Sequence, residues 1–288
     1  MHDLLSAHPY LSEDGCNILL PKGKLAAAYR TVLRGYAMTI RAYLDGSGKQ
    51  EDPNSNLLTL AGIAAQLPSW ERLESEWARI CWKHHVCGSH LKDAMHYHGD
   101  FEGWDLARRE SFFSDLEGVL IEFGNLPETY FSVVSIDLQA YRHVAEKKTT
   151  VLIAGLSQPY PDPATLCAFE CLNFLCWRKD AGSFELFFDR GEPFYNEIYQ
   201  IWNNPKKARL DERMKRVLRM SIGTQDFDLP LQATDYFAWH INRFWTKGDN
   251  APYGRLSQLM GGASHAWNID NLVDDRKIEL ALTGTYAV

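Results

Sequence analysis

Five short segments of this chain carry the residue pattern of β-strands, and helical patterns separate most of them. In the first, 38–45, apolar side chains alternate with more polar ones, and a period of two indicates a strand with two different faces. The other strands are expected at 57–65, 130–138, 183–189 and 213–222. Helices are expected at 68–82, 104–123, 164–177, 195–202 and 230–245. Strands first, followed by strands that alternate with helices, are typical of an α/β sheet covered by helices.

The chain is expected to form one main domain. We expect residues 1–36 to be an irregular N-terminal extension and residues 37–288 to be a single α/β domain, with a helical insertion at about 68–124. A hydrophobic content of 45% and a charged content of 23% are ordinary for a globular fold. The sequence contains no apolar run of the roughly 20 residues that a membrane span needs, and its start lacks the pattern of a secretion signal. We therefore expect a cytoplasmic protein that does not bind a membrane.

Two aspartates follow the strand patterns at the point where each strand ends. Asp45 ends the first strand and Asp189 ends the fourth. Active sites of α/β proteins usually lie beyond such strand ends, because the loops there vary while the strands hold them rigidly. The alternative is that each aspartate only forms a local turn.

A third aspartate, Asp235, falls at the edge of the apolar face of the helix 230–245. A carboxylate at the border of a buried face needs a partner, because burying an unpaired charge is costly. That partner is either an arginine or a backbone N–H group, or a cation shared with Asp45 and Asp189. Three carboxylates would form an oxygen-rich site for Mg²⁺ or Mn²⁺. Their convergence requires the first and fourth strands to be parallel neighbours.

Four segments resemble a known family. They are YLDGSG at 43–48, HLKDAMH at 90–96, FFDR at 187–190 and PLQATDYFA at 230–238, and they are similar to the family called domain of unknown function 3800, which resembles ribonuclease H in fold. The likeness covers roughly residues 40–243. It implies a ribonuclease-H-like mixed five-stranded sheet with helices on both faces and with the fourth strand beside the first. It also implies that Asp45, Asp189 and Asp235 form the acidic site.

The first motif departs from the family pattern. The family usually has Asp-Glu-Ser-Gly, whereas this chain has Asp45-Gly46-Ser47-Gly48, so the expected second acid is missing. Either Asp93 or another carboxylate takes its place, or the metal site is weakened.

The resemblance also implies roles for residues outside the three aspartates. Lys92, Asp93 and His96 are expected on a loop near the acids, with Asp93 as an outer metal ligand and His96 in substrate contact or proton transfer. Ser47, Lys92 and Gln232 are expected to contact substrate. The alternative is a solvated polar loop. Zinc is disfavoured there, because the cysteines and histidines between 81 and 98 lack the usual paired spacing.

A basic segment interrupts an otherwise acidic chain. Seven lysines and arginines lie between 206 and 219, and Lys215, Arg216 and Arg219 are expected to contact a phosphate backbone. The alternative is an edge strand protected by charge. The net charge of −7 disfavours a protein that coats nucleic acid but not an enzyme with a local basic track.

The leading hypothesis is a nuclease or phosphodiesterase that depends on Mg²⁺ or Mn²⁺ and acts on RNA or DNA. One alternative is a ribonuclease-H-like scaffold whose metal site has decayed and which binds a protein or nucleic-acid partner. Another is a phosphate-binding protein related to actin-like ATPases, which needs a second phosphate loop and a duplicated domain. The sequence leaves open the choice between RNA and DNA, between internal and terminal cleavage, and the oligomeric state.

Overall fold

The structure is a computed structural model of the chain. It describes residues 39–48, 56–87, 91–127, 129–153, 156–176, 182–192, 194–203, 214–247, 256, 259, 264–267 and 269–283. The expected N-terminal extension 1–36 and most of the basic segment lie outside the described residues. The account below concerns the unit from Thr39 to Val288.

The five expected strands form one mixed sheet. They are β1 (Ile40–Ser47), β2 (Leu57–Gln66), β3 (Tyr130–Asp137), β6 (Phe184–Asp189) and β7 (Val217–Gly223). A short strand, β8 (Ser264–Trp267), extends the sheet to six strands in the order β7-β6-β1-β2-β3-β8. Strand β2 is antiparallel to β1 and β3, whereas β6 is parallel to β1 and β7 is parallel to β6. The mixed five-stranded sheet is therefore confirmed, with the fourth expected strand beside the first.

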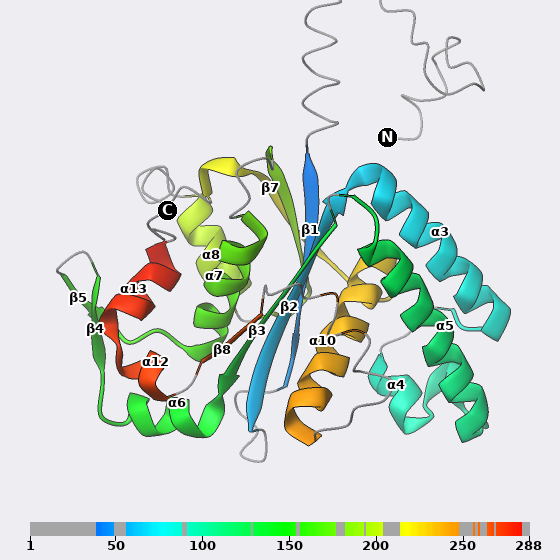
Figure 1. Cartoon of the computed structure of the whole chain (residues 1–288), viewed down its shortest axis with the longest axis horizontal. Helices are drawn as coiled ribbons and strands as arrows, with labels where there is room; N and C mark the ends of the chain where they lie inside the picture. Colours follow the sequence, from blue (N-terminus) through cyan, green and yellow to red (C-terminus); the bar gives the residue numbers. More distant parts are fainter. Residues whose placement is uncertain are drawn as a thin grey trace, which may run out of the picture. The chain divides into compact units, whose positions relative to one another are not determined.

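Helices cover both faces of the sheet (Figure 1). On one face α7 (Pro163–Cys176) packs against β2 and β3. This side also carries α6 (Leu138–Ala145), α8 (Tyr195–Trp202), α12 (Ile269–Val273) and α13 (Asp275–Thr283). A separate hairpin, β4 (Thr150–Ile153) and β5 (Leu156–Pro159), lies beyond them.

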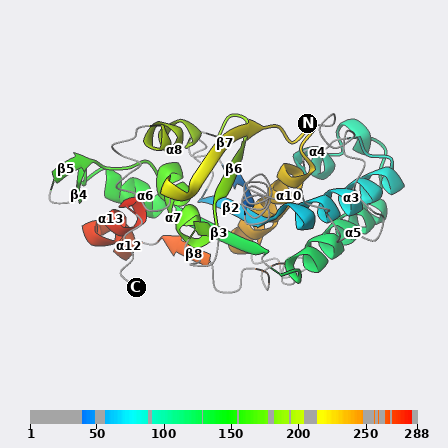
Figure 2. The ribbon, with the colours of Figure 1, turned by 90° about the horizontal axis from the view of Figure 1, so that it is seen from above.

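The other face carries the helices that position the acidic residues. There, α10 (Leu229–Lys247) packs against β1 and β2, and α3 (Leu67–His84) packs against α5 (Leu106–Gly124). Two short elements, α4 (Leu91–His96) and the 3₁₀ helix η1 (Gly99–Phe101), join α3 to α5 (Figure 2). A second 3₁₀ turn, η2 (Met214–Arg216), precedes β7.

The strand alternation explains which residues face which layer. Leu44 and Phe188 belong to the core beneath α7, whereas Tyr43 lies in the core beneath α3 and α10. Because the side chains of a strand alternate between faces, Asp45 and Asp189 belong to the α10 side of the sheet. Both faces of β1 are buried, since helices cover both.

The segment expected as a polar loop between 83 and 101 is partly helical instead. Helix α3 continues to His84, where His85 adopts a left-handed conformation with φ of 59° and ends it. Helix α4 then buries Leu91 and Ala94, and this pair of apolar residues explains why the segment folds onto its neighbours. None of the helices in the described residues is long and apolar enough to cross a membrane.

Candidate acidic site

Asp45 is the centre of the candidate site. Its side chain is buried, with 1% of its surface exposed. The Gln225 side chain donates to its Oδ2 atom at 2.9 Å, and the Gly46 backbone N–H donates to its Oδ1 atom at 2.9 Å. Both donors are neutral, so neither of these contacts supplies a positive charge to balance an ionised Asp45.

Asp189 and Asp235 reach the same region from different elements. Asp189 ends β6, which runs parallel to β1 and next to it. The sequence analysis required this arrangement of the first and fourth expected strands for the aspartates to lie close together. Asp235 is partly buried on α10, where its Oδ2 atom accepts a hydrogen bond from the backbone N–H of Leu91 at 3.2 Å. Of the partners expected for Asp235, the structure shows a backbone N–H group, that of the first residue of α4.

A fourth carboxylate, Glu192, joins the three aspartates, and the sequence did not single it out. Glu192 lies in the loop between β6 and α8, and its Oε1 atom accepts a hydrogen bond from the Gly46 N–H at 3.3 Å. An acid three residues after Asp189, at the same strand end, is the signal that could have identified it. Its approach to Gly46 across the sheet depends on the path of the loop.

The electrostatics of the site reflect four acids in close proximity. Burial, and then the negative charges of Asp235, Glu192 and Asp189, raise the pKa of Asp45 well above its ordinary value. Burial also raises the pKa of Glu192 to about 7, and the nearby Asp189 and Asp235 charges act in the same direction. The site therefore favours a proton or a cation over four free negative charges.

Two glutamine side chains and one tryptophan form a series of hydrogen bonds that supports Asp45. Gln225 points at Asp45, and its own backbone carbonyl accepts a hydrogen bond from the Gln232 side chain at 2.6 Å. The Trp77 indole N–H donates to the other end of the Gln232 amide at 3.2 Å. Gln232 was expected to contact substrate, but it is buried, with 4% of its surface exposed, and it supports Gln225 instead. Sequence analysis also did not single out Gln225, since a lone glutamine in a turn carries no pattern.

The expected residues on α4 follow Leu91, whose backbone N–H contacts Asp235. Lys92 and His96 are exposed and Asp93 is partly buried, and the His96 ring lies 5.9 Å from that of His98. The carboxylates whose charges raise the pKa of Asp45 most are Asp235, Glu192 and Asp189. Glu192 is the carboxylate that contacts Gly46, the position where the sequence resemblance led us to expect a second acid.

Ser47 ends β1 close to α10. Its backbone carbonyl accepts a hydrogen bond of 3.4 Å from the Asn242 side chain, which also donates to Thr59 Oγ1 at 3.0 Å. These contacts join α10 to the end of β1 and to the first part of β2.

The described residues of the basic segment 206–219 do not lie among the four acids. Lys215 and Arg219 are exposed, whereas Arg216 donates to the Gly182 carbonyl at 3.2 Å and lies over the Phe184 ring. Arg219 pairs in register with Glu185, near the start of β6, whereas Asp189 pairs with Gly223 at its end. Four residues along a strand separate the two positions by about 13 Å. The other basic residues of the segment lie outside the described residues.

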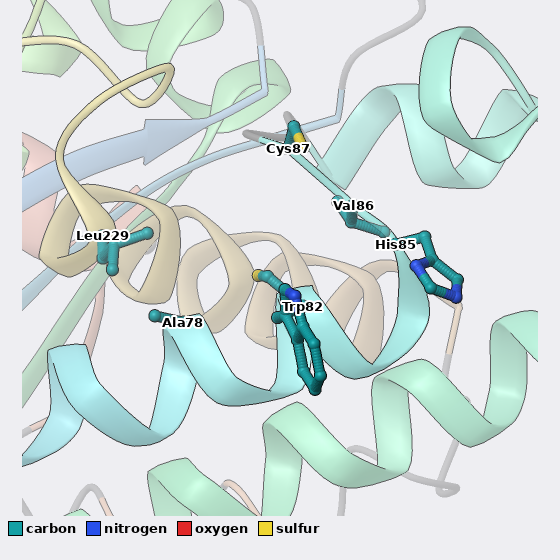
Figure 3. A pocket seen from close by; sticks show the side chains of 7 residues that line it. Ala78, Trp82, His85, Val86, Cys87 and Leu229 are labelled. Carbon is teal, nitrogen blue, oxygen red and sulfur yellow. The ribbon is translucent and has the colours of Figure 1, made fainter.

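A separate pocket of about 480 Å³ lies between the end of α3 and the start of α10 (Figure 3). Its lining includes Trp82, His85, Cys87 and Leu229. Trp82 is 80% exposed, and none of the four acids lines this pocket.

Within the part of the chain that the structure describes, no group of three or more histidine, cysteine, aspartate or glutamate side chains has the arrangement of a ready-made metal site. The carboxylates are instead held by protein donors. Their chemistry nevertheless fits a hard cation, because all the available ligand atoms are oxygens and because the four charges repel one another. Asp45, Asp189, Asp235 and Glu192 are the residues that could hold such an ion.

Fold and site together define a mixed α/β protein in which three partly buried acids surround the buried Asp45 near the ends of two parallel strands. No family model matches the sequence, and no curated protein matches it significantly.

Proposed function

We propose that this protein is a ribonuclease-H-like phosphodiesterase that cleaves RNA or DNA with the help of Mg²⁺ or Mn²⁺. The observation that carries the proposal is the approach of three further carboxylates, from β6, the loop after it and α10, to the buried Asp45. A buried charge surrounded by like charges is costly, and proteins retain such arrangements chiefly at functional sites.

A divalent cation would supply a bound water of lowered pKa and would neutralise the charge that develops in phosphoryl displacement. Asp45, Asp189, Asp235 and Glu192 would hold it. Gln225 would orient Asp45, and the hydrogen bond from Leu91 would orient Asp235. Trp82 offers an exposed aromatic surface on which a base of a single strand could stack.

The test compares thermal unfolding with and without Mn²⁺ for the wild type, Asp45→Asn and Asp235→Asn, and the control is the exposed Glu102→Gln. An ion that binds only the folded state raises the unfolding midpoint. We expect Mn²⁺ to stabilise the wild type and the control but neither aspartate variant. Each sample is also incubated with labelled single-stranded and duplex RNA and DNA. If the bound ion lowers the activation free energy of cleavage by several kcal/mol, both aspartate variants should cleave more than about 100-fold more slowly than the wild type.

The second candidate is a scaffold that binds a partner without metal chemistry. The acids are not at coordinating spacing in the described residues, and this arrangement favours the scaffold. An unfolding midpoint of the wild type that does not respond to Mn²⁺, together with intact RNA and DNA, would replace the first proposal with this one. The actin-like alternative is weaker, because the described residues contain one large sheet rather than a duplicated domain.

A further inference from the structure

Three aromatic side chains follow one another along one face of α8. Tyr195, Tyr199 and Trp202 are four and three residues apart, a spacing that makes side chains neighbours on a helix surface. The Tyr195 and Tyr199 rings are stacked with their centroids 5.7 Å apart, and the centroids of the Tyr199 and Trp202 rings are 5.8 Å apart. Ile198 is fully buried and attaches the helix to the core. We call Tyr195, Tyr199 and Trp202 the aromatic row.

The aromatic row lies at the border between the core and the solvent. Tyr195 and Trp202 pack partly against the core beneath α7, whereas Tyr199, between them, is 37% exposed. Single apolar residues scattered over a surface need no special explanation. Three rings in contact are different, because together they present a continuous aromatic surface to which a flat ligand can add by stacking.

The aromatic row leads from the acidic cluster to the basic segment. At its start, the Tyr195 N–H donates to the Glu192 carbonyl at 3.2 Å. At its end, the Trp202 indole N–H donates at 2.9 Å to the carbonyl of Val217, the first residue of β7, which follows the turn η2 with its exposed Lys215. Figure 2 shows α8 beside β7. Eight helical residues span about 10 Å, close to the distance of about 13 Å between the basic and acidic positions along the strands.

We propose that the aromatic row binds a single-stranded nucleic acid, with its bases against the exposed rings and its phosphates toward the basic segment. Every base has a face that stacks on an aromatic ring, and in a duplex these faces are covered by the neighbouring base pairs. The segment 206–219 has seven lysines and arginines and only two acids in a chain of net charge −7, and lysine and arginine are the residues that bind phosphates. This inference rests on the nucleic-acid substrate of the proposed function and names the single strand as its class.

A binding role and a purely structural role of Tyr199 predict different results. Tyr199→Ala removes the most exposed ring, so the affinity for a single strand should fall by at least about 10-fold. Tyr199→Phe keeps the ring and should bind within about 2-fold of the wild type. If the aromatic row only stabilised α8, Tyr199→Ala would lower the unfolding temperature and leave the affinity of the folded protein unchanged.

The experiment measures fluorescence anisotropy of labelled oligonucleotides of about 12 nucleotides, as single-stranded DNA, single-stranded RNA and the matching duplexes. A chelator is present throughout, so that no metal-dependent cleavage occurs. The proteins are the wild type, Tyr199→Ala, Tyr199→Phe and Lys215→Gln, and the control is Phe227→Ala, in which an 84% exposed ring is removed from the turn before α10. Thermal unfolding of each protein shows that it is folded at the temperature of the binding experiment.

We expect the wild type and Phe227→Ala to bind single strands equally, and more tightly than duplexes. Lys215→Gln should bind several-fold more weakly and show a smaller dependence of affinity on salt, because one phosphate contact is lost. Equal affinity of the wild type and Tyr199→Ala for single strands, or tighter binding of duplexes by the wild type, would overturn the inference and leave a nucleic-acid substrate in place.

The outcome also separates this inference from the proposed function. If the wild type binds none of the oligonucleotides, the nucleic-acid substrate fails and the inference fails with it. If Mn²⁺ does not stabilise the wild type and no substrate is cut, but Tyr199→Ala still loses single-strand binding, the metal-dependent cleavage is wrong and the single-strand site on α8 stands.

Discussion

At the scale of single residues, the site is organised by the burial of Asp45. A carboxylate at 1% exposure would ordinarily be paired with a cation, but Asp45 accepts hydrogen bonds from the neutral Gln225 side chain and the Gly46 backbone. Three more acids raise its pKa further. Gln232 and Trp77 support Gln225 through further hydrogen bonds and so help to hold its side chain against Asp45.

The raised pKa of Glu192 predicts how the stability of the metal-free protein depends on pH. In the unfolded chain this carboxyl has a pKa near 4.5, and in the folded protein about 7. Its protonated form is favoured by folding, so its stabilising contribution is complete below about pH 4.5 and is lost as the pH rises through 7. We expect the free energy of unfolding to fall over this window by on the order of 1–3 kcal/mol from this residue.

Urea unfolding in the presence of a chelator, at several pH values between 5 and 8, measures this effect. Glu192→Gln should show a shallower decline than the wild type. Asp45 has its pKa raised in the same direction, so part of the decline should persist in that variant. Parallel curves for the two proteins would show that Glu192 does not titrate in this range.

At the scale of elements, one close approach of a helix to the sheet is made at a glycine. A Cβ atom on Gly62 of β2 would lie 2.7 Å from Leu175 Cδ1 and 2.9 Å from Cys171 Sγ, both on α7. The helix can pack this closely only because residue 62 has no side chain. This contact sets the distance between α7 and the strand next to β1.

The substitution Gly62→Ala should therefore lower the free energy of unfolding by about 1–3 kcal/mol, the usual cost of overpacking a core. The matched control is Gly118→Ala in α5, where the added Cβ meets nothing within 4 Å. Alanine is the better helix former, so that change should raise stability by about 0.5–1 kcal/mol. Chemical denaturation measures both, and equal effects of the two substitutions would contradict the packing argument.

At the scale of the whole molecule, the C-terminal segment completes the core beneath α7. The α12 residue Leu272 and the α13 residue Ile278 are fully buried in that core. The Leu272 carbonyl accepts a hydrogen bond from Tyr160 at 2.8 Å, and the Ala281 carbonyl accepts one from Asn173 at 3.2 Å. The described C-terminal helices are thus joined to the body of the domain through both apolar and polar contacts.

Removing the side chain of Leu272 should therefore destabilise the domain. Leu272→Ala should cost about 2–4 kcal/mol, because it leaves a cavity in the core. Its neighbour Val273 is 55% exposed, so Val273→Ala should change stability by less than about 0.5 kcal/mol. Both are measured by denaturant unfolding followed by fluorescence. A Leu272→Ala protein as stable as the wild type would mean that the C-terminal helices do not contribute to the core.

Local patterns predicted much of the fold correctly. The five strands and the helices now seen as α3, α5, α7, α8 and α10 were expected within a few residues of their bounds, because alternation and helical periodicity are properties of neighbouring residues. The elements α4, α6, β4, β5, β8, α12 and α13 were not expected. They are short, and their formation depends on contacts with distant parts of the chain, such as that of Leu91 with Asp235.

The sequence alone determined that Asp45 lies near the C-terminal end of one strand, that Asp189 ends another, and that Asp235 lies at the edge of an apolar helix face, because each of these facts follows from a local period. Only the tertiary structure decided which side chains meet them. Gly46 and Glu192 are 146 residues apart, and Asp45 and Gln225 are 180 apart. Their contacts depend on the order of the strands and on the path of two loops, which no local pattern encodes. For the same reason, only the structure shows that Glu192 joins the acidic cluster and that Gln232 is buried and contacts Gln225.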